Sequence, residues 1–250
     1  MANEVLTEAR GRVLLITLNR PEAMNAVDSA LGLALVDAVK QLDDDAGLTA
    51  GVLCGAGRGF SAGMDLKAFA KEGPPKGFDT FLRDGSQKPL IAAVEGFALA
   101  GGLEIALTCD LLVAAKGVKL GIPEVNVGLF AAGGALLRLP RRVPYGVAME
   151  MALTSDPISA EQAAEYGLVS RLADKGQAVE VALELAERIA KNAPLAVAAS
   201  KQIIRETQGR TEEEFWKFQG PLTGKVFASE DAKEGPAAFA QKREPKWTGR

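Results

Sequence analysis

Short apolar runs alternate with an amphipathic segment in the first half of the chain. Residues 12–18 and 49–54 are rich in Val, Ile or Leu and are bounded by Gly or Pro, which predicts two strands. Between them, Asp28 or Ser29 can cap a helix. Its apolar positions recur at helical spacing: Leu31, Leu33, Ala34, Leu35, Ala38, Val39 and Leu42. Further strands are predicted at 89–95, 111–115 and 118–121, and a short buried helix at 101–108, so we expect α/β layering.

The pattern becomes one of successive helices from about residue 132. Ser159 is a plausible cap for a helix that stops at Gly167, and Thr211 precedes a run of acids typical of a first turn. Residues 177–191 and 195–207 have strongly helical patterns. We expect an α/β core over residues 1–190 and a helical C-terminal region over 191–250, not two independent domains.

Composition restricts the partners of the chain. The 250 residues are 48% hydrophobic and 24% charged, and the net charge of −3 gives no overall basic field to attract nucleic acid. No leader segment or apolar span of about 20 residues is present, which predicts a cytoplasmic protein.

Cys54 and Cys109 lie in separate apolar stretches, so we expect buried, inert thiols in a reducing compartment in preference to a catalytic or disulfide role.

The chain contains no histidine, and this restricts its chemistry. Ser-His-Asp and Cys-His nucleophile systems and all His-based metal sites are excluded. Acid–base catalysis must then use Asp, Glu, Lys, Tyr or Cys. An oxyanion must be held by backbone N–H groups or by Arg and Lys.

A carboxylate stands one turn inside the predicted helix that begins at Gly101-Gly102. The first N–H groups of a helix lack partners and carry partial positive charge, so they can stabilise a developing oxyanion. Glu104, three residues after Gly101, lies on nearly the same face. The alternative is that the glycines permit tight helix–strand packing and Glu104 has a structural partner. These residues alone leave both interpretations open.

A second carboxylate, Glu124, follows Pro123 in a similarly apolar stretch. A Pro-Glu pair is most often a solvated turn, but burial here would raise the carboxyl pKa and suit a group that exchanges a proton near neutrality.

An earlier segment, 55–60, imitates the start of a dinucleotide fingerprint. The third glycine of that fingerprint is replaced by Phe60, which argues against a Rossmann fold.

Three segments together resemble the crotonase (enoyl-CoA hydratase/isomerase) family. They are Gly59-Phe-Ser-Ala-Gly-Met-Asp-Leu66, Ala98-Leu-Ala-Gly-Gly-Leu-Glu104 and Pro123-Glu124, and the likeness extends over nearly the whole chain. The resemblance implies a crotonase-like ββα spiral core with a helical C-terminal trimerisation region. It also implies a homotrimer, commonly stacked in pairs as a hexamer.

The resemblance assigns roles to four positions. The backbone N–H groups of Met64 and Gly101 would hold the thioester oxygen of an acyl-CoA. Glu104 matches the residue that activates water at Cβ, and Glu124 matches the residue that protonates Cα, so the presence of both favours an enoyl-CoA hydratase. Three alternatives remain: a Δ3,Δ2-enoyl-CoA isomerase in which Glu124 shuttles the proton, another acyl-CoA enzyme of the crotonase family, and a non-catalytic acyl-CoA-binding subunit.

The resemblance also implies a CoA site. Ala62 and Leu66 would flank the adenine and pantetheine path, Lys67 would meet a phosphate, and Phe239 and Lys242 would complete the nucleotide site, often from a neighbouring subunit. The lysines could equally be ordinary solvated charges. No metal or redox cofactor is implied, because CoA is part of the substrate, and fatty-acid degradation is the commonest role in the family.

One segment departs from the family pattern. Residues 129–138 are Leu-Phe-Ala-Ala-Gly-Gly-Ala-Leu-Leu-Arg, whereas many members have polar Thr and Gln where Leu136 and Leu137 stand. We expect this change to affect packing behind Glu124 more than the chemistry. Residues 69–88 would shape the acyl pocket.

Overall fold

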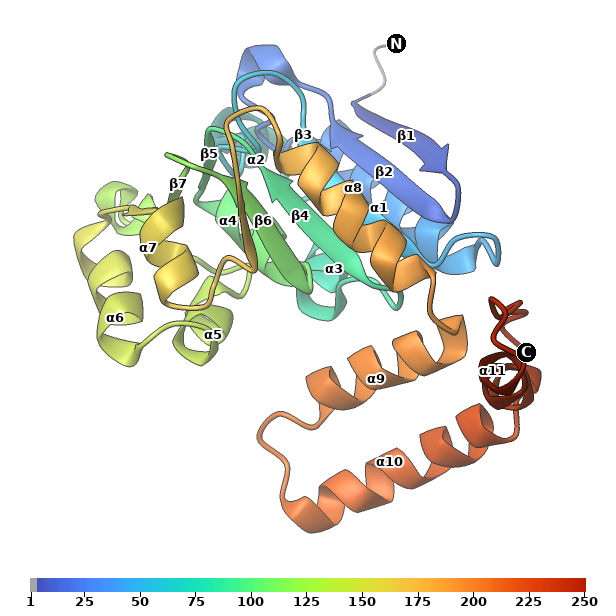
Figure 1. The fold of residues 1–250 in the computed structure, drawn as a ribbon. Coiled ribbons are helices and arrows are strands. Elements are labelled where there is room, and N and C mark those ends of the chain that lie inside the picture. Colours follow the sequence, from blue (N-terminus) through green and yellow to red (C-terminus); the bar gives the residue numbers. More distant parts are fainter. Residues whose placement is uncertain (1–3) are drawn as a thin grey trace.

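The computed structural model describes residues 4–250 and is built on a six-stranded sheet (Figure 1). The strands in spatial order are β1 (Val5–Arg10), β2 (Val13–Leu18), β3 (Ala50–Gly55), β4 (Leu90–Val94), β6 (Leu111–Ala115) and β9 (Arg171–Ala173). β1 is antiparallel to β2, and every other neighbouring pair is parallel. Parallel strands bury both faces, which explains the continuous apolar runs of β3 and β4.

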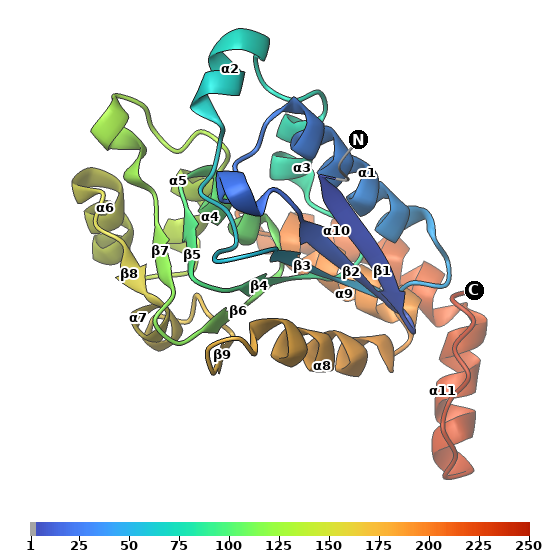
Figure 2. The same cartoon turned by 90° about the horizontal axis from the view of Figure 1, so that it is seen from above.

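Helices cover both faces of this sheet. The helix α8 (Ala178–Ala190) packs on one face, and α1 (Ser29–Asp44), α3 (Phe78–Asp84) and α4 (Gly101–Thr108) lie on the other (Figures 1 and 2). Five of the predicted apolar positions of α1 are buried: Leu31, Leu35, Ala38, Val39 and Leu42. Leu33 is exposed instead, because two residues along a helix turn a side chain to the opposite face.

A second, three-stranded sheet stands beside the first. It consists of β5 (Phe97–Leu99), β7 (Lys119–Gly121) and β8 (Ile158–Ser159), with β5 and β7 parallel. β5 leads through a single residue into α4. The remaining short elements are the 3-10 helices η1 (Pro21–Ala23), η2 (Pro123–Val127) and η3 (Leu139–Arg141) and the α-helices α2 (Leu66–Glu72), α5 (Ala135–Arg138), α6 (Tyr145–Thr154) and α7 (Ala160–Glu165).

The predicted elements agree with this architecture, with several omissions. The strands expected at 12–18, 49–54, 89–95, 111–115 and 118–121 match β2, β3, β4, β6 and β7 to within a residue or two. The strands β1, β5, β8 and β9 were not predicted, so the region after residue 132 is not purely helical. These strands are short or polar, and pairing with neighbours defines them more than their own sequence does.

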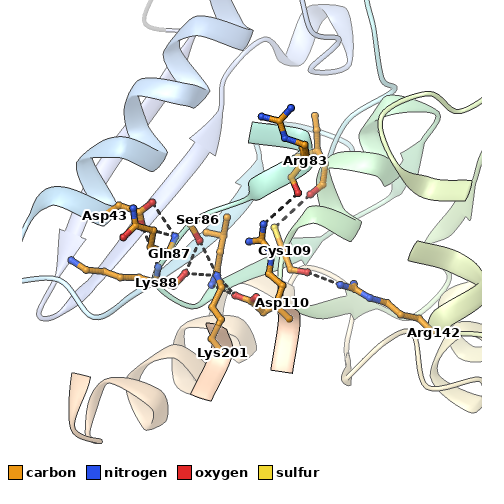
Figure 3. A network of polar contacts seen from close by, with 12 residues as sticks. Asp43, Arg83, Ser86, Gln87, Lys88, Cys109, Asp110, Arg142 and Lys201 are labelled. Atoms are coloured by element: carbon orange, nitrogen blue, oxygen red, sulfur yellow. Dashed lines mark hydrogen bonds and ion pairs between the residues drawn. The ribbon is translucent and has the colours of Figure 1, made fainter. Parts of the chain in front are cut away.

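Three helices form a C-terminal arm, residues 194–240, that extends away from the sheet (Figure 1). They are α9 (Pro194–Glu206), α10 (Glu212–Phe227) and α11 (Glu230–Ala240). α9 and α10 bury no residue. Lys201 of α9 joins the arm to the core through an ion pair with Asp110 (2.7 Å) and a hydrogen bond to the Lys88 carbonyl oxygen (2.7 Å), as Figure 3 shows.

Both cysteines are buried and unpaired, as predicted. Burial raises the pKa of the Cys54 thiol, and it raises that of Cys109 to about 12. Such thiols are almost fully protonated at neutral pH and are poor nucleophiles. Within residues 4–250, no helix is both long enough and apolar enough to span a membrane.

Candidate active site

A cavity of about 750 Å³ lies between α2, α3, α4, η2 and α5, and it brings together most of the predicted site residues. Six of them line it: Ala62, Met64, Leu66, Gly101, Glu104 and Glu124. Much of the remaining wall is large and apolar: Phe69, Phe78, Leu82, Leu129, Phe130 and Leu137. The cavity therefore combines two carboxyl groups with a predominantly hydrophobic surround, as binding sites for small molecules usually do.

Two backbone N–H groups meet at the edge of this cavity. Within residues 4–250, neither the Met64 nor the Gly101 N–H donates to a protein acceptor. The two nitrogens are neighbours, since a methyl group at Gly63 would lie 2.7 Å from the Gly101 nitrogen and one at Gly101 would lie 3.4 Å from the Met64 nitrogen. Gly63 also has a φ of +98°. This pair of free donors at the start of α4 can stabilise negative charge on a carbonyl oxygen.

The loop that carries Met64 is held in place by hydrogen bonds from the buried side chain of Asn25. Its side-chain amide donates to the carbonyl oxygens of Ala56 (2.9 Å) and Gly59 (3.0 Å) and accepts from the Arg20 backbone N–H (2.9 Å). Ser61 adds a hydrogen bond from its hydroxyl to the Asn25 carbonyl oxygen (2.8 Å). Because Asn25 and Ser61 are fully buried, this network holds the loop in one conformation.

The residue before the second donor has a strained backbone. Ala100, the N-cap of α4, has φ +52° and ψ −132°, a region that L-residues rarely occupy. Its N–H donates to the Gly121 carbonyl oxygen (2.9 Å), and its own carbonyl oxygen accepts from Leu103 and Glu104. The turn at Ala100 therefore orients the Gly101 N–H into the cavity, since the surrounding hydrogen bonds determine the path of the chain.

Glu104 is a buried carboxyl group, with only 5% of the residue exposed. Its Oε1 accepts a hydrogen bond from the Ala135 backbone N–H (3.1 Å). Burial raises its pKa to about 7, Glu124 adds to the increase, and the hydrogen bonds from the Ala135 and Gly133 backbone oppose it. At neutral pH this group can therefore either accept or release a proton.

Glu124 faces the same cavity from η2. It is half-buried, and burial raises its pKa as well. Its Oε2 is buried without a hydrogen-bond partner in the described part of the chain. A buried polar atom that lacks a partner is costly, so this oxygen is available for a substrate or a water molecule.

Three other predicted residues lie away from this cavity. Lys67 of α2 is exposed and does not line it. Phe239 of α11 is 87% exposed, and Lys242 follows the end of the same helix. α11 lies far from α2 in both views of the molecule (Figures 1 and 2). Within one chain these residues therefore do not complete the cavity.

Sequence reasoning missed several supporting groups. It did not identify Asn25, whose left-handed backbone (φ +53°) is one that Asn tolerates. It placed the 129–138 segment behind Glu124, where Leu129 does donate its N–H to the Glu124 carbonyl oxygen (3.1 Å), but it did not predict that the backbone of Gly133 and Ala135 contacts Glu104. The double glycine at 133–134 was the available signal, because adjacent glycines permit close approach to a side chain.

Comparisons with known proteins identify the family of this chain. A sequence model of the "Enoyl-CoA hydratase/isomerase" family matches residues 8–250. Enoyl-CoA hydratase EchA19 of Mycobacterium tuberculosis is 43% identical, with 99% of this chain and 97% of that protein covered. Carnitinyl-CoA dehydratase of Salmonella typhimurium is 40% identical over the full length of both.

A solved structure gives the same result for the fold. A probable enoyl-CoA hydratase/isomerase from Mycobacterium abscessus superposes with a TM-score of 0.96 at 54% identity, with both chains fully covered. The predicted crotonase-like α/β fold with a helical C-terminal region is thereby confirmed. Family, fold and cavity agree, and the chain therefore belongs to the enoyl-CoA hydratase/isomerase family and is an enzyme of that family.

Proposed function

We propose that this protein is an enoyl-CoA hydratase that adds water across a trans-2-enoyl-CoA to give a 3-hydroxyacyl-CoA. One observation carries the proposal: two glutamates with raised pKa values share an apolar cavity with two adjacent backbone N–H groups that have no acceptor within residues 4–250. Hydration needs a base for water, an acid for Cα and donors for the thioester oxygen, and these four groups supply all three functions.

The mechanism follows from the position of each group. The Met64 and Gly101 N–H groups bind the thioester oxygen and stabilise the enolate-like charge that develops there; one such donor is typically worth about 10²–10³ in rate. Glu104 accepts a proton from water as the oxygen bonds to Cβ. Glu124 donates a proton to Cα, so H and OH are added across the double bond. Proton exchange between the two carboxyl groups and solvent then restores the starting state.

The protonation states required are compatible with the environment of the pair. Glu104 must be ionised to act as the base, and its pKa of about 7 allows a large ionised fraction at neutral pH. Glu124 must be protonated to act as the acid, and burial shifts its pKa in that direction. Because the two groups interact, the limbs of a pH–rate profile would belong to the pair and not to either residue alone.

Substrate binding and assembly complete the proposal. Ala62 and Leu66 would flank the pantetheine path, and Lys67 would pair with a phosphate of CoA. Phe239 and Lys242 would reach the nucleotide from a neighbouring copy in a homotrimer or hexamer, since they do not approach the cavity of their own chain. Only water and protons are exchanged, so we expect no metal or redox cofactor, and we expect the enzyme to act in the cytoplasm.

A second candidate, Δ3,Δ2-enoyl-CoA isomerase, is favoured by one observation. Glu124 has a buried oxygen that makes no hydrogen bond to residues 4–250, whereas Glu104 is held by the Ala135 N–H. In an isomerase Glu124 alone would move the proton between carbons, and Glu104 would not take part. The two reactions therefore differ in their dependence on Glu104.

Crotonyl-CoA and a longer trans-2-enoyl-CoA test the proposal. Hydration removes the conjugated enoyl-thioester absorbance, and we expect rapid loss with the unmodified protein and a decrease in rate of at least about 10³-fold in both Glu104→Gln and Glu124→Gln. If neither substrate is hydrated, the proposal is wrong. Conversion of a 3-enoyl-CoA that needs Glu124 but not Glu104 would identify the isomerase instead.

A further inference from the structure

The guanidinium of Arg138, at the end of α5, contacts two different walls of the cavity. It donates to the carbonyl oxygens of Leu82 and Arg83 (3.2 Å to Arg83) near the end of α3. It also donates to the Gly133 carbonyl oxygen (3.2 Å). One planar side chain therefore joins α3 to the glycine segment, which is a use for which the fixed fork of arginine is suited.

The glycine segment lies between this guanidinium and the carboxyl group of Glu104. A methyl group at Gly133 would meet the Glu104 carboxyl oxygen, and one at Gly134 would collide with the Arg138 guanidinium. The next residue, Ala135, donates its N–H to Glu104. Side chain, glycine pair and carboxyl group are thus in direct contact, and a displacement of Arg138 would move the donors that hold Glu104.

Arg138 is a cation whose charge acts on Glu104, and Arg142 and Arg205 in turn act on Arg138; Arg205 donates to the same Arg83 carbonyl oxygen (3.3 Å). Arg138 is half-buried and has no carboxylate within ion-pair distance among residues 4–250. Its charge favours the ionised form of Glu104. The other charged groups that share the cavity are Glu124 on η2 and Asp79 and Arg83 on α3, and α4 itself carries no other charge.

We infer that Arg138 is a positioning residue for Glu104, which it orients through the Gly133–Ala135 backbone while its charge keeps that carboxyl group available as a base. The inference rests on the proposed function for the role of Glu104. In this role Arg138 does not need to touch the substrate. Its hydrogen bonds and its charge make separate contributions, which different substitutions can test.

Two substitutions at this position separate the contributions. Arg138→Met removes both the fork and the charge, so we expect kcat to fall about 10–100-fold, as small displacements of catalytic groups commonly produce. We also expect the acidic limb of the kcat/KM profile, which reports the carboxyl pair, to move to higher pH. The Arg138 charge and the backbone hydrogen bonds that Arg138 positions both lower the pKa of Glu104, and both are lost or weakened. Arg138→Lys keeps a charge but cannot reach three carbonyls at once, so kcat should fall while the limb moves less than in Arg138→Met, because only the backbone hydrogen bonds to Glu104 are weakened.

Arg142→Met is the matched control. Arg142 is another partly buried guanidinium, and it donates to the carbonyl oxygen of Cys109 (3.3 Å; Figure 3) but to no carbonyl oxygen of the glycine segment within residues 4–250. Its charge acts on Arg138, so this variant also tests whether the loss of a neighbouring charge alone moves the profile. We expect its pH profile to match that of the unmodified protein. An unshifted limb in Arg138→Met, or an equal shift in Arg142→Met, would overturn the inference.

Two further measurements cover the remaining outcomes. If Arg138→Met does not fold, Arg138→Lys decides: a kcat within twofold of the original overturns the inference, and a tenfold loss at unchanged thermal stability supports it. If the unmodified protein hydrates no enoyl-CoA, ¹³C NMR titration of glutamate-labelled protein, with Glu104→Gln for assignment, still measures the Glu104 pKa. A higher pKa in Arg138→Met supports the charge effect, and an equal pKa overturns it.

Discussion

The wall of the cavity and the C-terminal arm are built in opposite ways. The cavity wall is held by buried polar side chains: Asn25 and Ser61 beneath one loop, and Glu104 against the glycine segment. In the arm, no residue of α9 or α10 is fully buried, and large apolar side chains such as Ile204, Trp216 and Phe227 are exposed. One region is held by polar contacts within the chain, and the other leaves apolar side chains exposed.

This difference indicates which parts of the enzyme a single chain can supply. The two free N–H groups and both glutamates belong to one chain and lie on one cavity, so the reacting groups need no second copy. The exposed arm, with Phe239 and Lys242 at its far end, fits the proposal that other copies cover it and receive these residues. The catalytic groups would then depend on contacts within one chain. Binding of the CoA nucleotide would depend on contacts between chains.

The largest effect is expected where the cavity wall depends on one buried side chain. Asn25→Ala leaves the Ala56 and Gly59 carbonyl oxygens and the Arg20 N–H without their partner. We expect a loss of about 3–4 kcal/mol in the free energy of unfolding, because buried unsatisfied groups cost about 1–3 kcal/mol each. The oxyanion loop should also loosen and lower kcat.

Urea denaturation followed by crotonyl-CoA assays would measure both losses. Asn126→Ala is the control, since Asn126 lines the same cavity but is exposed. A loss below about 1 kcal/mol in Asn25→Ala would mean that the loop is held by other contacts.

The contrast between the two regions also explains what could be predicted from the sequence. The start of α4 was predictable from its double glycine, whereas the role of Glu104 came from the resemblance to the family, because the residues alone left two interpretations open. Asn25 and Arg138 were not predictable, because their partners are backbone carbonyls distant in sequence, and no local pattern marks a carbonyl that will need a donor. The arm was predicted as helical from periodicity, but periodicity does not distinguish an apolar face buried within the chain from one left for another copy.

Substitution of Glu104 is expected to stabilise the fold, whereas substitution of Asn25 destabilises it. The pKa of Glu104 rises from 4.5 to about 7 on folding, so the folded state binds this proton more tightly than the unfolded state. The favourable contribution is complete below about pH 4.5 and is lost as the pH rises through about 7. Glu104→Gln removes this dependence and can still accept the Ala135 hydrogen bond.

We therefore expect Glu104→Gln to be more stable than the unmodified protein at pH 8, by up to about 3 kcal/mol, and to differ little at pH 4.5. Denaturant unfolding at both pH values measures the difference, with the exposed Glu165→Gln as the control. Equal stability of the two proteins at pH 8 would show that the carboxyl group is not destabilised by burial.

A smaller gain is expected from relief of backbone strain at Ala100. Ala100→Gly allows φ +52° without a Cβ, which should stabilise the fold by about 1 kcal/mol while kcat falls, because the Gly101 N–H is then less firmly oriented. Ser155 supplies a matched control, since it also has a positive φ (+67°) but lies at the end of α6. Ser155→Gly should gain similar stability without a change in kcat, and a parallel loss of kcat in both would argue against a role for strain at Ala100.

The smallest effect on the chemistry itself is expected from the arm. Ile204→Ser and Phe227→Ser remove exposed apolar groups, so within one chain they should change stability by no more than about 0.5 kcal/mol. If other copies cover these residues, the double variant should instead lower the assembled mass in sedimentation velocity. It should also raise KM for the CoA substrate more than it lowers kcat, because Phe239 and Lys242 would no longer be delivered to the neighbouring site.

Lys217→Ser, on the same arm but in an exposed ion pair, is the control. An unmodified protein that sediments as a monomer would contradict the proposed assembly, and an unchanged mass in the double variant would show that the exposed apolar groups of the arm do not hold copies together.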